Sequence, residues 1–307
     1  RFICHLSSSN MIKGTFNGIL DGRNNTLSSS TQGIVDYFIQ VLGGKGEICH
    51  LTLTTGPLVT TNYGIIHDCS VNFAQSYSNS GDINSFGFIA GRNYNVIYSC
   101  HVYAQSFYHE RGYIGGIYGW NYKQVYKCSF DGNLSVNNNA SVGGIIASNY
   151  HSDSEYGVIS QCINNGTIGV KLNSEGRAWW TEVGGIAGNS YGTIDQCVNR
   201  GTVTTGCSSN VYDNSNYAGG IVGGLNHNVA LVSNCLHEGT VTTSFNLGSH
   251  NNNAGGIVGY GYLTNISNSI SVGRVVSTTS ISSYDHAIIG NNNQTGVEHC
   301  FYLHIAR

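Results

Sequence analysis

The sequence contains very little proline and very little charge. One of its 307 residues is Pro, and Asp, Glu, Lys and Arg together make up 9% of the chain. Its thirteen Lys and Arg residues form no basic run, so the sequence gives little support to a nucleic-acid partner. The 42 glycines could indicate disorder, but Ile, Val and Cys recur at fixed offsets between them, which favours a folded chain.

Long apolar runs and helical periodicity are also missing. No apolar stretch approaches the ~18 residues of a membrane helix, so we expect no membrane insertion within this chain. No stretch keeps apolar residues at i, i+3, i+4 and i+7 without an interrupting Gly, and almost no helix is expected. The chain begins at Arg1 without a signal peptide, and we interpret it as a piece of a longer protein.

A repeat takes up nearly the whole sequence. One unit, residues 184–203, reads GGIAGNSYGTIDQCVNRGTV, and its parts return from Gly219 and Gly255. The aligned apolar starts of the units are Ile34, Leu58, Ile89, Ile117, Ile145, Ile186, Ile221, Ile257 and Ile289. Short runs rich in Ile, Val and Thr between Gly and Asn are typical of strands.

Fixed strands joined by variable loops predict a solenoid. We therefore expect an all-β fold, a single-stranded right-handed parallel β-helix of about nine coils with three short strands per coil. Residues 1–32 are expected to form an opening coil or N-terminal cap region. Residues 33–307 are expected to form one continuous domain of repeats.

Most of the cysteines share one repeat position. The ladder residues are Cys69, Cys100, Cys128, Cys162, Cys197, Cys235 and Cys300, and Leu51 and Ser269 take the position in two other coils. We interpret them as a buried thiol ladder, because free Cys packs as a small hydrophobic residue. Zinc would need CxxC or Cys/His spacing, which is absent, so we expect no metal and no cofactor. Cys4, Cys49 and Cys207 lie off the ladder, and their redox state stays open.

Three further columns follow from the alignment. One is the Asn column Asn62, Asn93, Asn121, Asn149 and Asn293, with Ser190 in one coil. It predicts left-handed corners and amide hydrogen bonds along the rod. The Tyr column, Tyr63, Tyr94, Tyr122, Tyr150 and Tyr191, predicts an outer stack, or alternatively an aromatic platform for sugar rings. The polar position before each ladder residue, from Asp68 to His299, indicates a solvated face.

Three insertions of successive coils carry most of the aromatic residues outside the repeat. They span residues 171–183, 204–217 and 242–253 and should protrude from one side. We predict a binding surface there, formed by Trp179, Trp180, Tyr212, Tyr217, Phe245 and His250. The alternative is that Trp179 and Trp180 only cover the side of the barrel.

Enzymatic chemistry is weakly supported. A glycosidase needs two carboxylates about 5–9 Å apart, and few of the sixteen acids align in adjacent coils. The two acids of the best local cluster, Asp153 and Glu155, are expected to lie in an exposed loop. Two carboxylates alone make a poor calcium site. No catalytic residues are predicted, and whether the chain is an enzyme stays uncertain.

The units GGIAGNSYGTIDQCVNRGTV and GGIVG…VSNCLHEGTV resemble GLUG-type repeats, and GTFNGILDGRNNTL resembles the segment that often precedes them. The resemblance implies a pectin-lyase-like parallel β-helix of the kind found in adhesin-like surface proteins and in non-catalytic parts of some IgA-cleaving metallopeptidases. No HExxH motif is present, so peptidase activity is not implied.

From this resemblance we expect an extracellular or cell-surface protein with a structural or adhesive role, as a stalk, a filament or a binding surface. Its partners would be a glycan, a protein surface or copies of itself end to end. The alternative is a polysaccharide-processing lyase or glycoside hydrolase of the β-helix fold.

Overall fold

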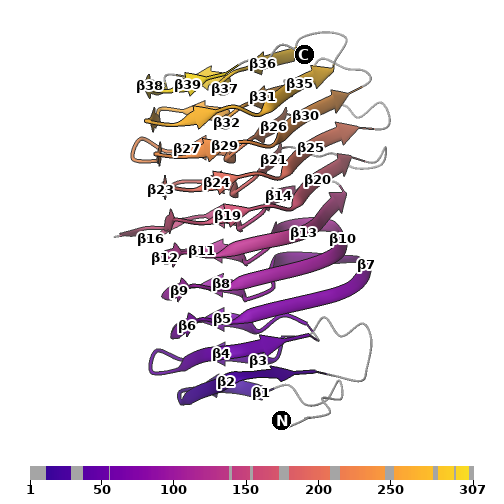
Figure 1. Cartoon of the computed structure of the whole chain (residues 1–307), viewed down its shortest axis with the longest axis vertical. Coiled ribbons are helices and arrows are strands. Elements are labelled where there is room, and N and C mark those ends of the chain that lie inside the picture. Colours follow the sequence, from indigo (N-terminus) through magenta and orange to yellow (C-terminus); the bar gives the residue numbers. More distant parts are fainter. Residues whose placement is uncertain are drawn as a thin grey trace.

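The computed structural model describes residues 12–28, 37–54, 56–137, 140–152, 155–172, 180–207, 215–245, 252–278, 283–293 and 295–303. Within these ranges there are 39 strands and no helix. No helix in this part of the chain could span a membrane. The strands wind into coils that stack along one axis, from indigo at one end of the rod to yellow at the other (Figure 1).

The first side of the rod is a parallel sheet of ten strands, one per coil. It consists of β1 (Ile12–Phe16), β3 (Ile39–Leu42), β5 (Val59–Asn62), β8 (Ala90–Asn93), β11 (Tyr118–Asn121), β15 (Ile146–Asn149), β22 (Ala187–Ser190), β27 (Val222–Asn226), β32 (Val258–Tyr262) and β37 (Ile289–Asn293). Each strand pairs with its equivalent in the next coil, which is the arrangement of a parallel β-helix. The predicted fold class is confirmed.

The second side is built from shorter strands. They are β6 (Ile65–His67), β9 (Val96–Tyr98), β12 (Gln124–Tyr126), β18 (Val158–Ser160), β23 (Thr193–Asp195), β28 (Leu231–Ser233), β33 (Asn265–Ser267) and β38 (Gly296–Glu298). At the N-terminal end, β2 (Ile19–Leu27) and β4 (Glu47–Leu53) continue this stack. The opening segment therefore adds a coil to the same stack.

The third side departs from the expectation of short strands. β7 (Ser70–Gly87) and β10 (His101–Gly115) are 18 and 15 residues long. In the later coils the third side is divided into several shorter strands. Its pieces are β13 (Ser129–Asn137), β14 (Ala140–Gly143), β19 (Ile163–Asn164), β20 (Thr167–Leu172), β21 (Trp180–Gly184), β24 (Val198–Asn199), β25 (Thr202–Cys207), β26 (Ser215–Gly219), β29 (Leu236–His237), β30 (Thr240–Phe245), β31 (Asn252–Gly255), β34 (Ile270–Ser271), β35 (Arg274–Thr278), β36 (Ser283–His286) and β39 (Phe301–Tyr302). The two-residue strands β16 (His151–Ser152) and β17 (Glu155–Tyr156) form an antiparallel hairpin.

The thiol ladder is buried inside the rod as predicted. Cys69, Cys100, Cys128, Cys162, Cys197 and Cys235 are at most 2% exposed, Cys300 is half-buried, and none of these seven cysteines is in a disulfide. In each of these seven residues Sγ donates a hydrogen bond to the carbonyl oxygen two residues earlier, as Cys197 does to Asp195 at 3.3 Å. Ser269 makes the same bond to Ser267 at 2.9 Å, which explains why the position accepts Ser.

The polar residue before each ladder position has a backbone role that the sequence reading missed. His50, Asp68, Ser99, Lys127, Gln161, Gln196, Asn234, Asn268 and His299 all have φ between 48° and 53°, or 55° for Lys127. The corner of each coil is therefore made by a left-handed residue just before the buried thiol. The expectation that the Asn column supplies left-handed corners was wrong, because Asn62, Asn93, Asn121 and Asn149 lie within strands and have no positive φ.

The other expectation for the Asn column is confirmed for Asn62, Asn93, Asn121 and Asn149, whereas the strand register places Asn292 rather than Asn293 in line with them. These four side chains are fully buried, and each Nδ2 donates along the rod, from Asn62 to Asn93 at 2.8 Å and onward to Asn121 and Asn149 at 2.9 Å. Asn149 donates to Ser190 Oγ at 3.0 Å. The Tyr column also stacks, with ring centroids 4.6–5.8 Å apart from Tyr63 to Tyr191.

The alignment of the terminal coils needs correction. Ile39 pairs with Val59, so Phe38, rather than Ile34, is the counterpart of Leu58. Val258 pairs with Ile289, so the counterpart of Ile257 is Ile288. Both units are irregular in sequence, and their register is fixed by the neighbouring coil. Ile34 itself lies outside the described residues.

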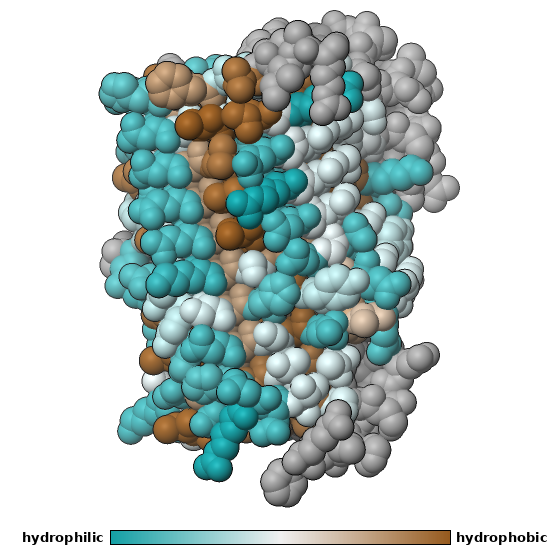
Figure 2. Space-filling model, viewed as in Figure 1, coloured by the Kyte–Doolittle hydropathy of each residue, from teal (hydrophilic) through white to brown (hydrophobic). Residues whose placement is uncertain are grey.

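Apolar side chains also reach the outer surface. Ile163, Val198, Leu236, Ile270 and Phe301 follow one another in register, and Phe301 is 65% exposed. Figure 2 shows apolar surface gathered in a band over the C-terminal coils of the face it draws, with polar surface on both sides. The rod is therefore not uniformly polar on its outside.

Candidate functional site

The third side turns back toward the first side at the Gly-Gly pairs of the repeat, and two strands approach closely there. A Cβ at Gly188 of β22 would lie 2.3 Å from Ser141 Oγ and 2.6 Å from the backbone nitrogen of Val142. Only Gly fits against the neighbouring strand, which explains the Gly at the fifth position of GGIAG. The outer faces of the two strands consequently meet in a concave corner.

A cavity of about 420 Å³ opens in this corner, and we call it the aromatic groove. It is lined by Tyr113, Ala140, Ser141, Tyr150, Trp180, Glu182, Asn189, Tyr191 and Asn226. Ser141 and Glu182 are opposite each other in β14 and β21, and Tyr113 precedes them in β10. Three successive coils thus place their side chains along one wall.

Glu182 lies at the base of the groove and is 7% exposed. The Asn226 side-chain amide donates to Glu182 Oε1 at 3.2 Å. Burial raises the pKa of Glu182 to about 7, although hydrogen bonds from Asn189 and Asn226 oppose this shift. Near neutral pH the carboxyl group is therefore present both as a hydrogen-bond donor and as an ionised acceptor.

Trp180 stands on the same strand as Glu182, two residues earlier, and therefore on the same outer face. It is 68% exposed, so most of its ring surface is accessible to solvent. Tyr150 and Tyr191, from the Tyr column, form the opposite wall of the groove and stack at 5.5 Å. The groove thus presents several aromatic rings around one carboxyl group.

Aromatic surface continues into the preceding coils. Tyr113 meets Trp120 edge-on at 5.4 Å, and the Arg92 guanidinium lies 4.9 Å from the centre of the Trp120 ring. A ligand lying along the rod axis would pass both the Tyr113–Trp120 ring pair and the Arg92 guanidinium. The cationic group gives this end of the surface a charge opposite to that of ionised Glu182.

Of the six residues of the binding surface that the sequence predicted, only Trp180 belongs to the described lining of the groove. Trp180 lines the groove, but it belongs to strand β21 rather than to a protruding loop. Tyr217, in β26, is 7% exposed and stacks on Tyr260 at 4.7 Å. Phe245 is the last residue of β30. Trp179, Tyr212 and His250 lie outside the described residues.

Sequence reasoning missed Glu182, Asn189, Asn226 and Tyr113. Glu182 directly precedes the Val-Gly-Gly motif, where an acid next to an apolar strand end could have drawn attention. The pairing of Glu182 with Asn226 joins residues 44 positions apart and needed the register of the coils. The Tyr column and Trp180 were the sequence signals that pointed to this corner.

The described lining of the groove contains a single carboxylate. Glu155, which the sequence singled out beside Asp153, is exposed in the β16–β17 hairpin and forms an ion pair with Lys123. Asp153 lies outside the described residues. The two-carboxylate arrangement of a glycosidase is therefore not assembled by the described residues of the groove.

A second group of reactive side chains lies at the N-terminal end of the rod. Asp21, Glu47, Cys49, His50, His67 and Asp68 form three overlapping groups in which the possible ligand atoms lie within 4.8 Å of one another. Burial, with the nearby charges of Asp21 and Glu47, raises the pKa of the Cys49 thiol to about 11. Cys49 and the two histidines are residue types that hold transition metals.

Comparisons with known proteins leave the family open. No protein-family model matches the chain, and no curated protein matches it. One solved structure that matches is described as "a putative immunoglobulin A1 protease from Bacteroides ovatus". It is 18% identical, with a TM-score of 0.45, over 89% of this chain and 77% of the other. At that score the likeness adds nothing to the fold, which rests on the strand pairings themselves.

Proposed function

We propose that this chain is an extracellular or cell-surface β-helical module that binds a glycan in the aromatic groove. The observation that carries the proposal is the exposed ring of Trp180 beside a cavity that contains the buried carboxyl of Glu182. The resemblance to GLUG-type repeats favours the same surface location and adhesive role.

The groove offers the two kinds of contact that a pyranose ring needs. The apolar C–H face of a sugar can cover an aromatic ring such as Trp180, whose exposed area water hydrates poorly. The hydroxyl groups of the sugar need donors and acceptors, which Glu182 and the amides of Asn189 and Asn226 supply. Since the residues that line the groove come from successive coils along the rod, an extended chain of sugars suits the groove better than a single ring.

The test is a glycan array followed by calorimetry with the best ligand. Trp180→Ala should weaken binding at least tenfold, about 1.4 kcal/mol, without changing the melting temperature, because the ring is exposed. Tyr63→Ala is the matched control, since Tyr63 is an exposed ring of the Tyr column at the far end of the rod. Equal binding by wild type and Trp180→Ala would contradict the proposal.

Processing of a polysaccharide is the second candidate function, and the raised pKa of Glu182 favours it. A carboxyl group with a pKa of about 7 is suited to proton transfer at neutral pH. Incubation with a polysaccharide panel should then release new chain ends, and Glu182→Gln should abolish the release while binding persists. Binding without any release would leave the adhesive function alone. End-to-end assembly of the rod stays a separate prediction, to be checked by its mass in solution.

A further inference from the structure

Three successive coils bring metal-ligating side chains into one outward-facing column. Asp21 in β2 is in register with Cys49 in β4, and Cys49 is in register with His67 in β6. Neighbouring strands are about 4.8 Å apart, so these side chains follow one another at that spacing. The same column continues as Tyr98 and Tyr126 in the later coils, where it holds stacked rings instead.

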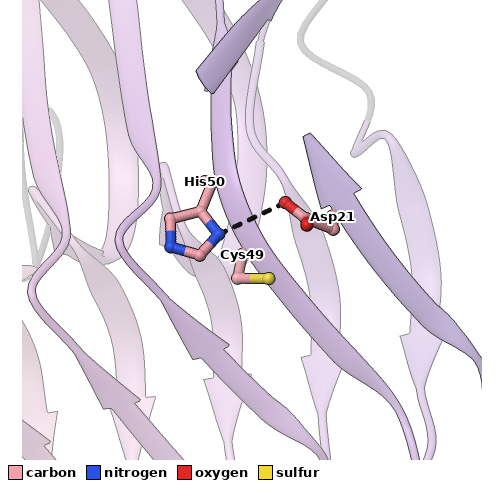
Figure 3. A group of neighbouring side chains, drawn as sticks. All are labelled: Asp21, Cys49 and His50. Carbon is pink, nitrogen blue, oxygen red and sulfur yellow. Dashed lines mark hydrogen bonds and ion pairs between the residues drawn. The ribbon is translucent and has the colours of Figure 1, made fainter. Parts of the chain in front are cut away.

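The left-handed corner adds a ligand from the same coil. Consecutive side chains of a strand point to opposite faces, but His50 has a φ of 50° and interrupts this alternation. His50 and Cys49 therefore lie together outside the barrel, while Leu51 points into the core. Figure 3 shows Asp21, Cys49 and His50 pointing toward one another from neighbouring strands.

The distances suit a tetrahedral ion. His50 Nδ1 and Asp21 Oδ1 are 3.2 Å apart, and the possible ligand atoms of His67 lie within 4.8 Å of those of Cys49 in one group and of His50 in another. Two nitrogen or oxygen ligands on a tetrahedral zinc ion are separated by about 3.3 Å, given bonds of about 2.0 Å. The His50 and His67 rings meet edge-on with centroids 5.7 Å apart, so the two imidazoles are in contact.

We propose that this cluster binds a zinc ion through Asp21, Cys49 and His50, with His67 as the fourth ligand. A thiolate, imidazoles and a carboxylate form a donor set that zinc accepts in tetrahedral sites. Asp68 Oδ2 lies 2.7 Å from His67 Nδ1, which is the carboxylate contact that orients a ligating histidine, and Asp68 is therefore a positioning residue. The ion would tie β2, β4 and β6 together at the N-terminal end of the rod.

The sequence did not predict this site because the ligands are 28, 1 and 17 positions apart along the chain. That spacing matches no CxxC or His-x-His pattern, so metal binding was not expected. The ligands become neighbours only through coil stacking. The described residues also place Glu47 and Asp68 around the site, and the excess of carboxylates there favours a cation.

The experiment uses the whole chain, stripped with a chelator and then titrated with Zn²⁺ or Co²⁺. We expect one ion per chain by elemental analysis, and with Co²⁺ a thiolate-to-metal charge-transfer band and intense visible bands of a tetrahedral ion. Cys49→Ser should remove the charge-transfer band, and His50→Ala should weaken binding at least tenfold. Asp68→Asn should weaken it about 10- to 100-fold.

Two controls keep the result specific. His101 forms an exposed pair with Asp131 at 3.7 Å, but it belongs to no group of three possible metal ligands among the described residues. His101→Ala should therefore leave Co²⁺ binding unchanged. Cys300→Ser tests whether a half-buried thiol elsewhere supplies the band. Absence of the band in folded wild-type protein, or its survival in folded Cys49→Ser, would overturn the site. Retention of full affinity by His67→Ala would overturn the role of His67 as fourth ligand.

Discussion

Asn121 Nδ2 donates a hydrogen bond to Asn149 Oδ1 at 2.9 Å, 28 residues along the chain and one coil away. Asn121 Oδ1 accepts from Asn93 Nδ2 at 2.9 Å and from the backbone nitrogen of Lys123 at 3.4 Å. Each buried amide therefore provides a hydrogen-bond partner for the amide of the preceding coil and for the backbone of the turn beside it. Such a chain of bonds holds successive coils in register as well as stabilising them.

Replacing Asn121 with Leu should destabilise the rod by about 3 kcal/mol, because buried donors and acceptors on both neighbouring coils lose a partner. The measurement is urea unfolding followed by circular dichroism. Asn133→Ala is the control, since Asn133 is exposed and bonds only the Gln105 carbonyl among the described contacts. A change below about 0.5 kcal/mol for Asn121→Leu, similar to a surface substitution, would show that the ladder does not stabilise the stack.

The thiols at the centre of the ladder should be unreactive in the folded protein. Cys128, Cys162, Cys197 and Cys235 are at most 2% exposed, and buried thiols without access do not react with thiol reagents. We expect mass spectrometry to find them labelled only after unfolding. Cys300 is half-buried and provides the internal comparison. Labelling of Cys197 as fast as Cys300 would contradict the buried ladder.

The same position should accept Ser and reject a charge. Cys197→Ser keeps a donor for the Asp195 carbonyl, as Ser269 does for Ser267, and should cost about 1 kcal/mol. Cys197→Asp introduces an unpaired charge into the core and should prevent folding or lower the melting temperature far more. Calorimetric melting compares them, and equal losses for both variants would argue against a specific donor position.

Glu182 should make the protein less stable as the pH rises. The folded pKa of about 7 lies above the ordinary value of 4.5, so the folded state holds a proton that the unfolded state has already released. Its contribution is fully present below pH 4.5 and is lost as the pH rises through 7, by on the order of 3 kcal/mol.

Glu182→Gln should remove this loss, so that the variant gains stability over wild type at pH 8 relative to pH 4.5. Urea unfolding at the two pH values measures the difference. Glu155→Gln, at an exposed carboxylate, should show no such gain. An identical pH dependence in wild type and Glu182→Gln would mean that Glu182 is not buried as an acid.

His237 should have the opposite effect. It occupies the position of Asn199 in the neighbouring coil, its Nδ1 lies 3.1 Å from Ser271 Oγ, and its Nε2 has no hydrogen-bond partner among the described residues. Burial lowers its pKa from 6.5 to about 4. Below pH 6.5 the unfolded chain takes up a proton that the folded chain refuses, so stability is lost as the pH falls toward 4.

His237→Asn restores the amide of the neighbouring coil and should reduce the acid sensitivity by on the order of 3 kcal/mol between pH 7.5 and pH 4. Unfolding by urea at these two pH values is again the measurement. His101→Asn, at an exposed histidine, is the control. Greater acid sensitivity in His237→Asn than in wild type would contradict the assignment.

The sequence by itself determined the repeat and what the repeat requires. Cys197 and its equivalents, the Asn column and the Tyr column recur at fixed offsets, and one strand-corner-strand unit can satisfy such recurrence only by stacking on copies of itself. The parallel β-helix, the buried ladder and both stacks were therefore predictable. Where the repeat was irregular, at Ile34 and Ile289, the sequence alignment failed, because pairing with the neighbouring coil fixes register there.

Only the tertiary structure decided where chemistry can occur. The repeated pattern does not include the groove residues Glu182 and Asn226 or the cluster residues Asp21, Cys49 and His67. Which residues lie beside them in space depends on how many residues each coil contains. Insertions change that number from coil to coil without changing the strands. Residues far apart in sequence therefore meet at a spacing of about 4.8 Å that no motif in the chain records.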